Sequence, residues 1–103
     1  MGEVSERLGA SVLLENDRVR VWDDRVGPGD TQHLHVHRRP YIAVIIAGER
    51  AETIGDDGSV QRRFDGLTPG ETHYFGPEDL PLVHALRNTG STEVAVVIIE
   101  LFT

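Results

Sequence analysis

His33-Leu34-His35-Val36-His37 is the stretch of this sequence that decides both fold and chemistry. Histidines alternate with apolar residues, which predicts a strand with all three imidazoles on one face. Neighbouring histidines would lie about 6.6 Å apart along the strand, so two imidazoles can converge on one ion at about 2.1 Å. The outer two, roughly 13 Å apart, cannot share an ion. The stretch therefore predicts a metal-binding pair, and a solvated polar strand face is the competing interpretation.

The rest of the chain has the pattern of an all-β protein. Glycine, proline, asparagine and aspartate interrupt it at short intervals, and the intervening runs alternate apolar and polar residues or are apolar throughout. Asp56-Asp57-Gly58 is expected to form a hairpin turn, and Gly2–Leu8 could form at most a short N-terminal helical turn. The pattern fits a sandwich or a barrel. The expected strands are 18–22, 31–37, 41–47, 49–54, 59–64, 72–75, 82–87 and 93–102.

Length and composition narrow the function classes. The 103 residues are enough for one domain, which we expect to span 1–103. The net charge of −7 argues against sequence-independent nucleic-acid binding, and no apolar run approaches the length of a membrane span. Without cysteine there can be no disulfide and no zinc-thiolate site. The residues after Met1 do not resemble a secretory signal, so we expect a cytoplasmic protein.

The residues around the histidine stretch resemble the first motif of the cupin family. That motif is a glycine, five residues, H-x-H, three or four residues, a glutamate, six residues and a glycine. Every interval fits, and the alignment leaves His33 outside the metal site. The difference is a tyrosine where the family usually has a glutamate ligand. The matching positions are Gly29, His35, His37, Tyr41 and Gly48.

A second cupin motif is matched in part. Its H-x-x-x-N element is present as His84 and Asn88, preceded by Gly70, but its P-x-G is replaced by a longer loop, 76–81. The resemblance covers roughly 12–101 and implies a single cupin barrel, a double-stranded β-helix or jelly-roll. It also implies that one divalent ion is held by His35, His37 and His84.

Three neutral imidazoles without a carboxylate would leave the full charge of the ion uncompensated and two or three positions open. Such a site suits Fe(II), which we favour, as well as Zn(II), Ni(II) or Cu(II). It does not suit Mg(II) or Ca(II), which prefer oxygen ligands. The alternative is a cupin that has lost its ion along with the missing glutamate.

Six further residues are candidates for the site. Tyr41, His73 and His33 are candidate catalytic residues because a phenol or an imidazole near the ion could donate or carry a proton. Arg38 and Arg39 could bind an anionic substrate through paired hydrogen bonds, and Trp22 could line the pocket. The competing interpretation is structural. A tyrosine or tryptophan on a strand usually packs in a core, and exposed arginines and histidines are often only solvated.

The resemblance implies an enzyme that acts on a small molecule. We favour a three-histidine Fe(II) dioxygenase with a small organic substrate, and an anionic one would suit the uncompensated charge. The first alternative is a redox-neutral metal-dependent isomerase, cyclase or decarboxylase. The second is a cupin that binds a small molecule without turnover. Because open β edges invite pairing, we also expect a homodimer.

Overall fold

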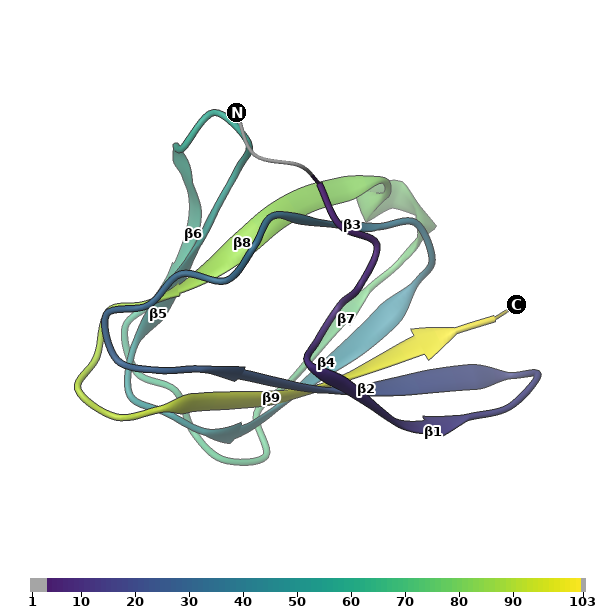
Figure 1. Cartoon of the computed structure of the whole chain (residues 1–103), viewed down its shortest axis with the longest axis horizontal. Coiled ribbons are helices and arrows are strands. Elements are labelled where there is room, and N and C mark those ends of the chain that lie inside the picture. Colours follow the sequence, from purple (N-terminus) through teal and green to yellow (C-terminus); the bar gives the residue numbers. More distant parts are fainter. Residues whose placement is uncertain (1–3, 103) are drawn as a thin grey trace.

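The computed structural model describes residues 4–102, and this part of the chain is built almost entirely from strands (Figure 1). One 3₁₀ turn, η1 (Pro77–Asp79), interrupts them. The strands are β1 (Ser11–Glu15), β2 (Val19–Val26), β3 (His35–His37), β4 (Tyr41–Ala47), β5 (Ala51–Ile54), β6 (Val60–Phe64), β7 (Thr72–Phe75), β8 (Leu82–Asn88) and β9 (Val94–Leu101).

The strands form two sheets. One has the order β1-β2-β9-β4-β7 and the other the order β3-β8-β5-β6. Every strand pair is antiparallel. The sheets face each other as in a jelly-roll without closing into one continuous barrel, which confirms the predicted all-β class (Figure 1).

Because side chains alternate between the two faces of each strand, every second side chain points into the core between the two sheets. On β2, Trp22, Asp24 and Val26 are buried while Arg25 is exposed, as the twofold period of a strand requires. The buried apolar cluster is drawn mainly from the five-stranded sheet, with Leu8 and Ala51 in addition. It consists of Leu8, Trp22, Tyr41, Ile45, Ala51, Val94, Val96 and Ile98.

Backbone geometry explains why an asparagine and a glycine stand at the motif positions 88 and 48. The amide nitrogen of Asn88 donates to the carbonyls of Val26 and Thr92, and its oxygen accepts the N–H of Gly90. Gly48 has a φ of +134°, and a Cβ there would lie 2.9 Å from the Val94 side chain. These two motif residues therefore shape turns.

The N-terminal segment differs from the expectation. Residues 4–8 contain no helical turn, because Ser5 instead pairs with the edge of β3: its N–H donates to Leu34 and its carbonyl accepts from Val36, both at 2.9 Å. Gly2 and Glu3 lie outside the described residues. β1 was not expected, since its apolar run Val12-Leu13-Leu14 does not alternate and is exposed.

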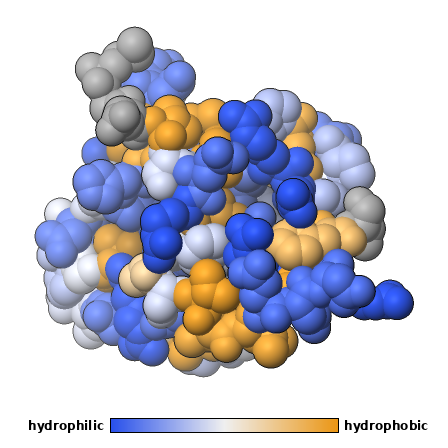
Figure 2. All heavy atoms as spheres, turned by 45° about the vertical axis from the view of Figure 1, so that its right-hand side comes forward, coloured by the Kyte–Doolittle hydropathy of each residue, from blue (hydrophilic) through white to orange (hydrophobic). Residues whose placement is uncertain are grey.

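The outer surface carries both apolar and polar side chains. On the face drawn in Figure 2, apolar patches are separated by polar side chains. None of the helical structure within residues 4–102 has the length and apolar character to cross a membrane.

Candidate metal centre

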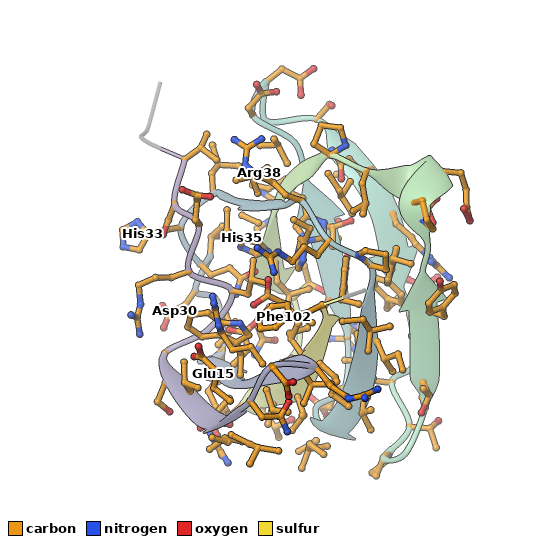
Figure 3. All side chains as sticks on the ribbon, turned by 90° about the vertical axis from the view of Figure 1, so that its right-hand side faces the viewer. Glu15, Asp30, His33, His35, Arg38 and Phe102 are labelled. Atoms are coloured by element: carbon orange, nitrogen blue, oxygen red, sulfur yellow. The ribbon has the colours of Figure 1, made fainter. Side chains whose placement is uncertain are left out.

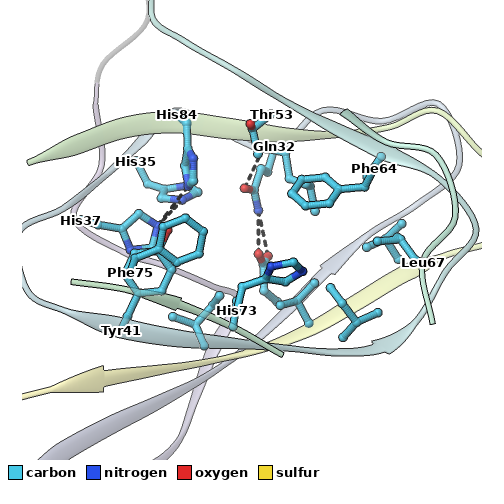
Figure 4. Close-up of a pocket in the computed structure, with 18 residues that line it drawn as sticks. Gln32, His35, His37, Tyr41, Thr53, Phe64, Leu67, His73, Phe75 and His84 are labelled. Atoms are coloured by element: carbon cyan, nitrogen blue, oxygen red, sulfur yellow. Dashed lines mark hydrogen bonds between the residues drawn. The ribbon is translucent and has the colours of Figure 1, made fainter. Parts of the chain in front are cut away.

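His35 and His84 are brought together by strand pairing. They stand directly opposite each other in the antiparallel pair of β3 and β8. Directly opposed residues have Cβ atoms about 4.5–5.5 Å apart, so both imidazoles reach the same point. His37 joins them because it lies two residues further along β3, on the same face. Figure 4 shows the three side chains gathered at one end of a pocket.

The three imidazoles converge through one type of atom. Nε2 of His37 lies 3.0 Å from Nε2 of His35 and 3.1 Å from Nε2 of His84. Two Nε2–H groups cannot point at each other at such distances, so at least one nitrogen of each pair presents a lone pair to this point. His35 and His37 are buried and His84 is partly buried.

The electrostatics keep these histidines neutral. Burial lowers the pKa of His35 to about 4 and that of His84 to about 3. Burial, together with the charges of the other two histidines, lowers the pKa of His37 to about 2. Neutral imidazoles can bind a metal ion without first losing a proton.

The donor set fits a divalent transition ion. Nitrogens about 2.1 Å from one ion lie about 3.0 Å apart when they are at right angles, and about 3.4 Å apart in a tetrahedron. The two distances from His37, 3.0 and 3.1 Å, match right angles between His37 and each of the other two ligands, and all three nitrogens lie within 4.8 Å of one another. Nδ1 of His35 lies 3.4 Å from the carbonyl oxygen of His33, to which it can donate, leaving Nε2 free as a ligand. Nδ1 of His37 is buried without a hydrogen-bond partner.

A cavity of about 80 Å³ adjoins the histidines between the two sheets. Apolar side chains make up most of its wall, among them Ile45, Leu67, Phe75 and Val96. A shallower groove of about 230 Å³ shares four lining residues with the cavity, so we take it as the mouth. The shared residues are Thr53, Phe64, Phe75 and His84.

Tyr41 lines the cavity beside the histidines. Its ring stacks on that of His37, with centroids 3.8 Å apart, and on that of Phe75 at 4.6 Å. Only 2% of Tyr41 is exposed, and burial raises the pKa of its hydroxyl further above the usual range. The residue in the usual glutamate position is thus a neutral phenol that packs against a candidate ligand.

His73 also lines the cavity, on β7, and faces it from the five-stranded sheet. Its Nε2 lies 2.7 Å from Oε2 of Glu71. Its ring makes an edge-to-face contact with that of Phe64, with centroids 5.6 Å apart. His73 is therefore a cavity-lining residue and not one of the three candidate ligands.

Four candidate residues lie elsewhere. His33 is exposed and points away from the cavity, because the chain at 32–34 is not part of a strand and the expected alternation fails there (Figure 3). Arg38 and Arg39 are exposed, and neither lines the cavity. Trp22 is buried in the core, where its indole N–H donates to Glu100 at 2.7 Å. None of these four lines the cavity, and their positions agree with the competing structural interpretation.

Sequence reasoning missed a buried polar pair. Asp24 on β2 and Gln32 line the same cavity, and the Gln32 amide lies 2.9 Å from each Asp24 carboxylate oxygen. Burial raises the pKa of Asp24 to about 6, and the Gln32 hydrogen bonds oppose this. The signal was present, since Trp22-x-Asp24-x-Val26 puts an aspartate at an inward position. Arg62 at the mouth was missed as well.

Comparisons with known proteins agree with this architecture. No protein-family model matches the sequence, and the search of curated proteins gives no match. Among solved structures, a cupin domain from Bordetella pertussis Tohama I is similar over 98% of this chain and 97% of its own, with a TM-score of 0.74 and 25% identity. A protein with a double-stranded β-helix domain from Klebsiella pneumoniae is similar over 88% and 69%, with a TM-score of 0.65 and 26% identity.

An enzyme is also among the similar structures. The DMSP lyase DddQ from Ruegeria pomeroyi matches 84% of this chain and 39% of its own, with a TM-score of 0.59 and 21% identity. These neighbours differ in what they do, so what they have in common is the architecture. With its two facing sheets, and with such neighbours over most of its length, the chain is a protein of the cupin fold.

Proposed function

We propose that this protein is a metal-dependent enzyme for a small organic substrate, and that it is most simply an Fe(II) dioxygenase. The observation that carries the proposal is the convergence of three neutral imidazoles, with Nε2 of His37 3.0 and 3.1 Å from the Nε2 atoms of His35 and His84. A site with three protein ligands leaves positions on the ion open to substrate, as catalytic metal sites require. When bound, the ion supplies activation of dioxygen and of a chelating substrate.

The chain's own residues supply binding and orientation. His35, His37 and His84 would hold the ion, and the apolar wall around them would limit water near the reacting atoms. Tyr41, stacked between two rings, has little freedom to move, so its hydroxyl can act only as a fixed hydrogen-bonding group. The cavity volume of about 80 Å³ favours a substrate of few non-hydrogen atoms.

A redox-neutral reaction is the second candidate, and two side chains favour it. Asp24 and His73 both line the cavity, and burial raises the pKa of Asp24 to about 6. Carboxyl and imidazole side chains are common general acids and bases. An isomerase, lyase or decarboxylase with Zn(II) or another Lewis acid would use such groups. A lyase among the structural neighbours is consistent with this candidate.

Elemental analysis of untagged protein, purified without added metal, is the first test. The proposal expects close to one transition ion per chain, and iron together with substrate-dependent oxygen consumption supports the dioxygenase. Zinc, with turnover unchanged under anaerobic conditions, supports the redox-neutral enzyme. Protein that neither retains nor takes up any transition ion would contradict both and favour a non-catalytic binding protein.

A further inference from the structure

The wall of the cavity holds a buried carboxylate, that of Asp24. Asp24 is 7% exposed and lies on β2 between Trp22 and Val26, which are buried as well. Within residues 4–102 no arginine or histidine is ion-paired with it. A buried carboxylate without a cation is costly, so its presence needs an explanation.

Within residues 4–102 the side-chain hydrogen-bond partner of Asp24 is Gln32, whose orientation is fixed by the backbone. The side-chain oxygen of Gln32 accepts the N–H of Leu86 at 2.8 Å, and the backbone N–H of Gln32 donates to the carbonyl of Leu86 at 3.0 Å. The amide nitrogen of Gln32 must therefore face Asp24. Gln32, anchored to Leu86 of β8, is a positioning residue that holds the carboxylate in place.

Asp24 keeps unused acceptor capacity. A carboxylate has about four acceptor positions, and one amide group of Gln32 reaches the two oxygens. Both residues line the cavity that contains the three histidines, and Gln32 is hydrogen-bonded to Leu86, two residues from His84 on β8 (Figure 4). The cavity thus holds two polar groups on its wall, the metal-binding imidazoles and the Asp24 carboxylate.

We propose that Asp24, held by Gln32, recognises a hydrogen-bond donor at the far end of the ligand, and an ammonium group in preference to a hydroxyl. The ligand class is then a short aliphatic molecule with a metal-binding group at one end and an amine at the other. Only the metal-binding group of this ligand rests on the proposed function; the amine follows from Asp24 and Gln32 alone. An ammonium would provide the cation that Asp24 lacks, and hydrogen bonds between charged groups are about twice as strong as neutral ones.

The test uses Co(II)-loaded full-length protein and three matched series of short carboxylates of two to five non-hydrogen chain atoms, ending in an amine, a hydroxyl or a methyl group. Changes in the visible Co(II) spectrum report binding. At the best length, the amine should bind about tenfold or more tightly than the methyl compound, with the hydroxyl between them. Asp24→Asn should abolish this preference, and Asp23→Asn, one residue away and outside the cavity lining, should retain it.

A second measurement avoids both the metal and the variants. In metal-free wild-type protein, the side-chain amide signals of Gln32 in a proton–nitrogen correlation spectrum should move with the amines and stay in place with the methyl compounds. If Co(II) does not bind but these signals move, the proposed function fails and the Asp24 inference stands. Equal affinity of the amine and methyl series, or an amine preference that survives in Asp24→Asn, would overturn the inference. So would an unmoved Gln32 amide in metal-free protein.

Discussion

Tyr41 lies face to face with His37, with ring centroids 3.8 Å apart and an angle of 14° between the planes. The stack holds the ring face of the imidazole, whereas the other two histidines contact its Nε2, so Tyr41 supports the candidate metal centre by packing. The ring of Tyr41 packs against His37, whereas its hydroxyl could act on the substrate, and different substitutions test these two roles.

Tyr41→Phe should leave the metal content and the free energy of unfolding nearly unchanged, because the stacked ring remains. Turnover should fall if the hydroxyl acts on the substrate. Tyr41→Ala should lower the free energy of unfolding by about 3–5 kcal/mol, since it empties a buried ring site. Denaturant unfolding and elemental analysis of both variants check this. A large loss of metal in Tyr41→Phe would mean that the oxygen itself is a ligand.

Replacing His35, His37 or His84 by alanine should each lower metal affinity by at least about 100-fold, because loss of even an outer partner of a ligand costs about 10–100-fold. His33→Ala is the matched control and should have little effect, since its side chain points away from the cavity. Competition with a chromogenic chelator gives the affinities. If His84→Ala retained the metal, His84 would not be a ligand and β8 would contribute nothing to the metal centre.

Asp24→Asn should stabilise the metal-free protein at neutral pH. Because the pKa of Asp24 is raised from 3.8 to about 6 on folding, the folded state holds the proton more tightly than the unfolded state. Stability from this group is therefore lost as the pH rises from about 4 to 6, and the loss persists above 6. The variant should gain about 1–3 kcal/mol at pH 7.5 and almost nothing below pH 3.5. Thermal or urea unfolding at both pH values measures the difference. A gain that does not depend on pH would indicate a different cause.

We expect a homodimer that uses the edge of β1. This strand ends the five-stranded sheet, and Val12, Leu13 and Leu14 are 42%, 58% and 55% exposed. An exposed apolar edge strand invites pairing with a second copy. Light scattering should give twice the chain mass, and Leu14→Lys should reduce it to the monomer. Val60→Lys, on the edge strand of the other sheet, is the control. Dissociation by this control alone would place the interface at β6.

The sequence was sufficient for the elements that depend on local pattern. Runs such as Tyr41–Ala47 and Val94–Leu101 are long and apolar between turn residues, so their strands could be predicted. The grouping of His35, His37 and His84 came from motif spacing, which records strand register indirectly. Neither inference required knowledge of distant contacts.

The positions of His33 and Asp24 were not predicted because they depend on contacts between segments that are far apart in the sequence. His33 continues the alternation in the sequence, but Thr31 forms only an isolated bridge and β3 begins at His35. Asp24 holds an inward position two residues after Trp22 but lies beyond the strand expected at 18–22, and its partner Gln32 is brought to it by hydrogen bonds with Leu86. Such pairs follow from the meeting of two sheets, which no local pattern encodes.

The cross-strand position of His84 opposite His35 has a consequence for folding. The unfolded chain keeps only the His35–His37 pair close together, while the third imidazole is far away in sequence. An ion bound by all three would therefore bind the folded state far better than the unfolded state, and by mass action it would shift the folding equilibrium. The same ion would tie β3 to β8 and act as a cross-link that forms only when the two strands are in register.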